Sequence, residues 1–85
     1  MARFQTTAEK IARARTLIQQ ARDLPVPAEG GKFNFTYIAE VKDLLRQARD
    51  LVKFIPLQPT TTPEIKKDVE AVFQEADQAN KDILL

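Results

Sequence analysis

The carboxylates are the side chains of this sequence that could perform acid–base chemistry or bind a metal ion. The chain has no histidine, cysteine, tryptophan or serine, so the usual nucleophiles, the commonest general base and the commonest zinc ligands are absent. Asp43 and Asp50 would share one face of a helix, whereas Glu75 and Asp77 would point to different sides of another. We expect Asp43 and Asp50 to lie on a solvated helix face and to form ion pairs with Lys42, Arg46 or Arg49, and we expect Glu75 and Asp77 to be no better as metal ligands. The sequence therefore predicts a protein with no enzymatic activity, no cofactor and no metal site.

The positive charges do not indicate a nucleic-acid or phosphate site. Gly30-Gly31-Lys32 has some likeness to a phosphate-binding loop, but it lacks the flanking spacing and the Ser or Thr after the lysine, so we expect a turn in a surface loop. The net charge is only +1. Up to Phe54 there are ten Lys and Arg against six Asp and Glu, and from Ile55 onward three against six. This asymmetry favours basic helices beside an acidic one over a nucleic-acid surface, which needs clustered positive charge.

Three aromatic residues alternate just before the middle of the chain: Phe33, Phe35 and Tyr37. They could be an exposed hook for a protein partner, because aromatic anchors dominate the energetics of interfaces. Alternatively, they could close the open end of a helical core, where small domains place large side chains. We favour the second interpretation, with at least one ring left exposed.

These residues must be positioned by helices, because the apolar residues recur at steps of three and four. The longest such pattern predicts a helix over residues 36–55, with further helices over 7–23 and 63–83. The first two helices contain a repeat, since Leu17–Leu24 matches Leu44–Leu51 at an offset of 27 positions. Three similar amphipathic helices predict an all-α fold, an antiparallel three-helix bundle.

Local signals mark where each helix begins and ends. Thr6 followed by Glu9 forms a capping-box pattern, and Thr62 with Pro63 begins the third helix in the same way. Asn34 or Thr36 would cap the second helix. Prolines at positions 25 and 56 should end the first two helices, because a proline disfavours helical backbone at the residue before it.

Length and composition predict a single domain over residues 1–85. The absence of cysteine fits a reducing compartment, so we expect an intracellular protein. The sequence has no apolar run approaching the ~18 residues that a membrane span requires, and no secretory signal near its start. We therefore expect no insertion into a membrane.

Two segments resemble a known helical pattern. One is Lys42-Asp43 followed, after four residues, by Ala48-Arg49-Asp50 and a large apolar residue; the other is Leu17-Ile18 leading through Ala21-Arg22 into Leu24-Pro25-Val26. Both resemble the PLU-type helical region of the jumonji–ARID histone lysine demethylases, although the tryptophan usual in that family is Leu51 here. The resemblance covers roughly residues 17–55. It implies a scaffold within a chromatin regulator in the nucleus, to which no catalytic, iron-binding or zinc-binding residue would carry over.

The third helix is similar to a second family. Residues 65–83, with Phe73 and Ala76, resemble the third helix of the microtubule-interacting-and-transport domain, and Ala14, Leu17 and Ala21 suit its first helix. That resemblance implies a hydrophobic groove between the second and third helices that accepts a peptide helix. The connection over residues 25–35 is longer than the short turn which joins the first two helices in that family.

The sequence thus predicts a non-catalytic scaffold or protein-interaction domain, with a protein or helical peptide as its partner and no small-molecule substrate. Two alternatives remain open, a peptide-binding adaptor with a helix-in-groove site and a self-associating bundle, so that the chain would be a monomer or a weak dimer. A scaffold would bury the large apolar residues of the second and third helices, whereas an adaptor would leave two or more of them along an open strip. The candidate partner-binding residues are Phe33, Phe35, Tyr37, Leu44, Leu51, Val72 and Phe73.

Overall fold

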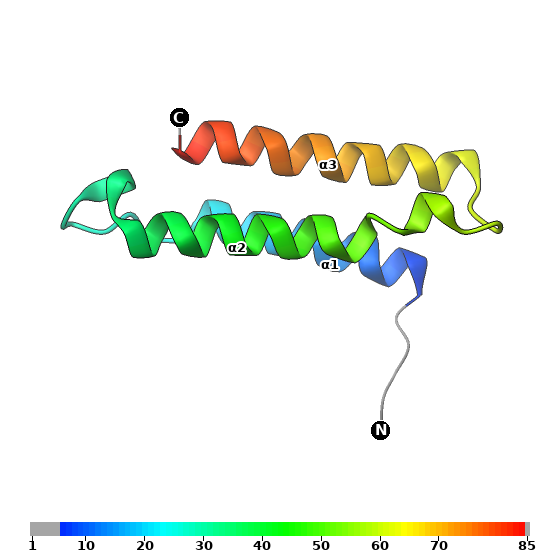
Figure 1. Cartoon of the computed structure of the whole chain (residues 1–85), viewed down its shortest axis with the longest axis horizontal. Helices are drawn as coiled ribbons and strands as arrows, with labels where there is room; N and C mark the ends of the chain where they lie inside the picture. Colours follow the sequence, from blue (N-terminus) through cyan, green and yellow to red (C-terminus); the bar gives the residue numbers. More distant parts are fainter. Residues whose placement is uncertain (1–5, 85) are drawn as a thin grey trace, which may run out of the picture.

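The computed structural model of this chain describes residues 6–84 and is an all-α three-helix bundle. The first and third helices run in the same direction, and the second runs antiparallel to both (Figure 1). All three pairs of helices pack against one another. The elements are α1 (Thr7–Asp23), the 3₁₀ turn η1 (Gly31–Phe33), α2 (Phe35–Val52), the 3₁₀ turn η2 (Ile55–Leu57) and α3 (Pro63–Leu84).

Side chains cap the start of each helix, as the sequence predicts. The hydroxyl of Thr6 accepts a hydrogen bond from the backbone N–H three residues later, at 3.1 Å, and the hydroxyl of Thr62 does the same at 3.3 Å. Asn34, rather than Thr36, caps α2, with its Oδ1 accepting from the N–H of Tyr37 at 3.1 Å. Each cap satisfies one of the backbone donors that a helix start leaves without an intrahelical acceptor.

The end of α2 differs from the predicted boundary. The helix ends at Val52, three residues before the expected Ile55, and its last turn closes with the N–H of Lys53 donating to the carbonyl of Arg49 at 2.9 Å. Pro56 prevents the helix from continuing, because it has no N–H to donate to the carbonyl of Val52, but it does not account for the end of the helix before Lys53. Ile55 instead opens η2, and its side chain is still only 2% exposed. The chain thus leaves the helix without removing this side chain from the core.

A single apolar core joins the three helices. Five alanines lie fully inside this core: Ala14, Ala21, Ala48, Ala76 and Ala79 are all 0% exposed. Small side chains at these positions let the helix backbones approach, and larger side chains fill the space between them. Among the described residues no polar or charged side chain is buried. The larger core residues are Ile11, Leu17, Ile18, Tyr37, Val41, Leu45, Val52, Ile55, Val69 and Val72.

Candidate functional site

The three alternating aromatic residues separate into two classes. Phe33 and Phe35 are 74% and 89% exposed, whereas Tyr37 is 5% exposed and belongs to the core. The expectation that these rings close the end of the bundle therefore holds for Tyr37 alone, and a role for Tyr37 in partner binding has no support from its position. The reason is the start of α2 at Phe35: residues two apart on a helix point in nearly opposite directions. Once Tyr37 faces the core, Phe35 must face solvent.

A short ordered turn holds the two exposed phenylalanines. The amide Nδ2 of Asn34 donates to the carbonyl of Glu29 at 3.0 Å, while its Oδ1 caps α2. Gly30 has φ of +82°, a left-handed conformation that glycine adopts without steric cost. The ammonium of Lys32 lies 5.5 Å from the centroid of the Phe33 ring. We call Phe33 and Phe35, on this turn, the aromatic tip.

The four candidates on the second and third helices are not equally accessible. Val72 is 0% exposed, so it is a core residue. Leu44, Leu51 and Phe73 are partly buried and pack against the core from its margin. A scaffold would bury all four and an adaptor would expose two or more, and the structure lies between these cases. The Leu51 side chain lines a hollow of about 260 Å³ on the α1 side of α2, together with Leu17 of α1.

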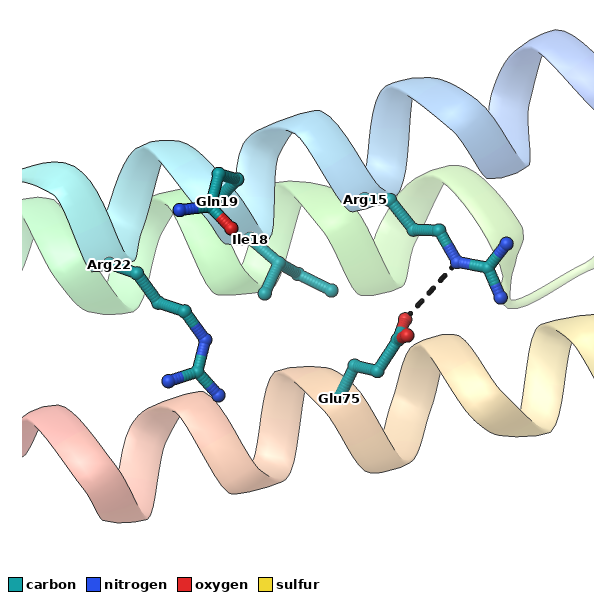
Figure 2. A pocket seen from close by; sticks show the side chains of 5 residues that line it. All are labelled: Arg15, Ile18, Gln19, Arg22 and Glu75. Atoms are coloured by element: carbon teal, nitrogen blue, oxygen red, sulfur yellow. Dashed lines mark hydrogen bonds and ion pairs between the residues drawn. The ribbon is translucent and has the colours of Figure 1, made fainter.

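A second surface hollow, of about 320 Å³, lies between α1 and α3 (Figure 2). Arg15 and Arg22 reach across it from α1 towards α3, and Ile18 forms its floor. The Nε of Arg15 donates to Glu75 Oε2 at 3.2 Å, which places opposite charges side by side in the hollow. Two arginines and one glutamate line the hollow, and Arg22 pairs with Asp82 of α3, so these charges belong to a helix–helix contact.

The remaining carboxylates that the sequence analysis considered form local pairs within one helix. Asp43 accepts hydrogen bonds from Arg46 and Gln47, and these bonds, that of Arg46 first, hold the pKa of the Asp43 carboxyl below its ordinary value of 3.8. Asp50 pairs with Lys53 at 3.2 Å. Asp43 thus pairs with one of the expected residues, whereas Asp50 pairs with Lys53, just after the end of α2.

The other acidic pair is divided between two sides of α3. Asp77 pairs with Lys81 on the same helix at 3.1 Å, whereas Glu75 reaches across to α1. Within residues 6–84, no group of three or more histidines, cysteines, aspartates or glutamates is arranged to hold a metal ion.

The opposite end of the bundle carries exposed apolar residues that the sequence analysis did not select. Phe54 and Leu57, in the connection between α2 and α3, are 62% and 76% exposed. The ammonium of Lys53 lies 5.1 Å from the centroid of the Phe54 ring. Their signal in the sequence was weak, because both residues fall where the helical pattern breaks down before and after Pro56.

Comparisons with protein-family models, with curated proteins and with solved structures found no match to this chain. No helix within residues 6–84 combines the length and apolar character needed to cross a membrane. The residues themselves must therefore carry the functional argument.

Proposed function

We propose that this chain is a non-catalytic protein-interaction domain which binds a protein partner through its aromatic tip. The observation that carries the proposal is the exposure of two phenylalanines two positions apart, Phe35 at 89% and Phe33 at 74%, on a hydrogen-bonded turn. Leaving such rings in water forgoes about 1.5–3 kcal/mol each, which burial against a partner would recover. Aromatic side chains of this kind are the usual anchors of protein interfaces.

The hydrogen bonding of the turn supports the same proposal. Asn34 ties the turn to α2 through two hydrogen bonds, and the left-handed Gly30 directs the chain into η1. Binding at a preformed tip costs less conformational entropy than binding at a loop that must become ordered in the complex. The second exposed pair, Phe54 and Leu57, serves for comparison, because the connection between α2 and α3 that carries it lies at the other end of the bundle from the connection between α1 and α2 (Figure 1).

A place in a larger chromatin regulator stays a prediction that rests on the resemblance of residues 17–55 to the PLU-type region. In that setting the bundle would be a scaffold and the aromatic tip its contact with a neighbouring protein. A nuclear location has the same basis and is part of this proposal.

The experiment that tests the proposal is a selection of displayed random peptides on the immobilised domain. The library is first depleted on a Phe33→Ser/Phe35→Ser variant, so that peptides which bind elsewhere are removed. A parallel depletion uses Phe54→Ser/Leu57→Ser, which removes similar exposed apolar area at the opposite end. Circular dichroism confirms that both variants fold, as expected for substitutions of exposed residues.

We expect peptides to survive depletion on the first variant and not on the second, and to shift the backbone amide resonances of residues 31–37. Peptides that survive only depletion on the Phe54→Ser/Leu57→Ser variant would move the site to the other end. If no peptide distinguishes the tip variant from the unmodified domain, the proposal is wrong.

A further inference from the structure

The sequence repeat produces matching rows of side chains on α1 and α2. Each row follows the same spacing of four, three and four residues, and equivalent members are 27 positions apart. The two rows have the same leucine, glutamine and leucine at their last three positions, and they differ only at the first, which is arginine on α1 and glutamate on α2. The rows are Arg13, Leu17, Gln20 and Leu24 on α1, and Glu40, Leu44, Gln47 and Leu51 on α2.

The antiparallel arrangement of α1 and α2 sets these rows side by side in opposite directions. Leu17 of the first row and Leu51 of the second line the same hollow, together with Gln47. A repeat that runs in opposite directions on two neighbouring helices has local twofold pseudo-symmetry. The other two leucines, Leu24 and Leu44, are therefore related to the first two by this local axis, and both are partly buried at the margin of the core. Leu17 itself is only 6% exposed and belongs to the core, so the surface that we call the leucine seam consists of the three partly buried leucines Leu24, Leu44 and Leu51.

The hollow on the leucine seam also holds two opposite charges. Arg13 lines it from α1 and Asp50 lines it from α2. In the described part of the chain Asp50 pairs with Lys53, whereas the guanidinium of Arg13 has no ion-pair or hydrogen-bond partner. Arginine is enriched at protein interfaces, and its charge-assisted hydrogen bonds to carboxylates are among the strong ones.

We propose that the leucine seam is the contact surface for a second copy of this chain. In the dimer, α1 of each copy lies over α2 of the other, about a twofold axis parallel to the helices. Arg13 of each copy then meets Asp50 of the other, and Leu51 packs over the margin of the hollow on the other copy, each contact made twice, while Leu17 stays in the core of its own copy. All adjacent helices of the resulting four-helix layer are antiparallel, as in common four-helix bundles, and the contact is self-complementary, as a twofold interface requires.

The test measures self-association of the full chain and of charge-reversed variants. Sedimentation equilibrium follows the mean mass from low micromolar to about 1 mM, a range that reports weak dimers. Arg13→Asp and Asp50→Arg each place like charges opposite one another in the dimer, and the double variant Arg13→Asp/Asp50→Arg restores the attraction. Leu51→Glu removes the apolar contact, and Leu57→Glu is its matched control on the connection between α2 and α3. Circular dichroism verifies folding, and the charge variants decide the question if Leu51→Glu unfolds the chain.

We expect the mass to rise towards twice the 9.6 kDa of one chain. Each single charge reversal should raise the dissociation constant about tenfold or more, and the double variant should return it to within about threefold of the unmodified value. The Leu57→Glu and Phe33→Ser/Phe35→Ser variants should dimerise normally. A chain that stays monomeric up to about 1 mM, or a double variant as weak as the two singles, would overturn the proposal.

Discussion

Arg22 of α1 donates a hydrogen bond to Asp82 of α3, with 3.1 Å between Nη1 and Oδ2, and seven residues earlier Arg15 makes the equivalent contact with Glu75. Both pairs join residues 60 positions apart, so α1 and α3 must run parallel and in a constant register. Arginines from the basic first part of the sequence thus pair with carboxylates from its acidic last part across this contact. Their side chains are 35–47% exposed, so the pairs contribute more to register than to stability.

Replacement of Asp82 by asparagine should make the stability of the domain less sensitive to acid. Hydrogen bonds from Gln78 first and then from Arg22 hold the pKa of the Asp82 carboxyl below its ordinary value of 3.8. The folded state therefore binds this proton less readily than the unfolded state, and the stabilisation is lost as the pH falls below about 4. Urea unfolding midpoints at pH values from 7 down to 2 measure the effect.

The control for this experiment is Asp68→Asn, which changes an exposed α3 carboxylate that has no ion pair in the described structure. We expect this variant to follow the acid dependence of the unmodified chain. If Asp82→Asn lost stability with acid as steeply as the unmodified chain, the pKa of Asp82 would not be lowered by folding.

An enlarged side chain at Ala76 should destabilise the bundle. Ala76 is 0% exposed within the core, so Ala76→Leu must displace its neighbours at a cost of about 1–3 kcal/mol in the free energy of unfolding. Ala39→Leu adds the same atoms on the exposed face of α2 and should change stability by less than about 0.5 kcal/mol. Chemical denaturation of both variants tests this. Equal stability would mean that the helices do not approach closely at Ala76.

Removal of the α2 cap should also reduce stability. Asn34→Ala removes the hydrogen bond to the N–H of Tyr37 and the bond to the carbonyl of Glu29, and we expect a loss of about 1 kcal/mol. Thr36→Ala is the control, because the sequence alone made Thr36 an equal candidate for the cap, whereas in the structure Asn34 is the cap. Should Thr36→Ala prove the more damaging substitution in thermal unfolding, α2 would begin at a different residue.

Gly30 provides a test of the turn that carries the aromatic tip. Its φ of +82° is unfavourable for a residue with a Cβ atom, and a Cβ there would lie 3.4 Å from the Cα of Asn34. Gly30→Ala should therefore cost about 1–2 kcal/mol in the free energy of unfolding. Gly30→Asn should cost less, because asparagine tolerates the left-handed region. If the alanine variant were as stable as the unmodified chain, this turn would not have the described conformation.

Local signals predicted most of the fold. The caps at Thr6 and Thr62 and the apolar stripes gave the three helices and their approximate bounds, because these features depend on residues a few positions apart. The end of α2 was placed at Ile55 instead of Val52, since a buried side chain in a 3₁₀ turn continues the apolar pattern after the helix has ended. The sequence also left the cap of α2 open between Asn34 and Thr36.

The candidate site was harder to predict, since it depends on which way each side chain faces. The alternation of Phe33, Phe35 and Tyr37 did not reveal that the last is buried, because that depends on where α2 begins. The ion pair between Arg15 and Glu75 was not predicted, because the two residues are 60 positions apart and meet only when α1 packs against α3. The predicted chromatin association and nuclear location stay predictions.

The most direct test of the interaction proposal is the affinity of a selected peptide for three proteins. Isothermal titration compares the unmodified domain with Phe33→Ser/Phe35→Ser and with Phe54→Ser/Leu57→Ser. We predict that loss of the aromatic tip weakens binding by at least about 2 kcal/mol, or some thirtyfold, and that the change at the opposite end leaves it unaltered. Equal affinity for the unmodified domain and the tip variant would contradict the proposal.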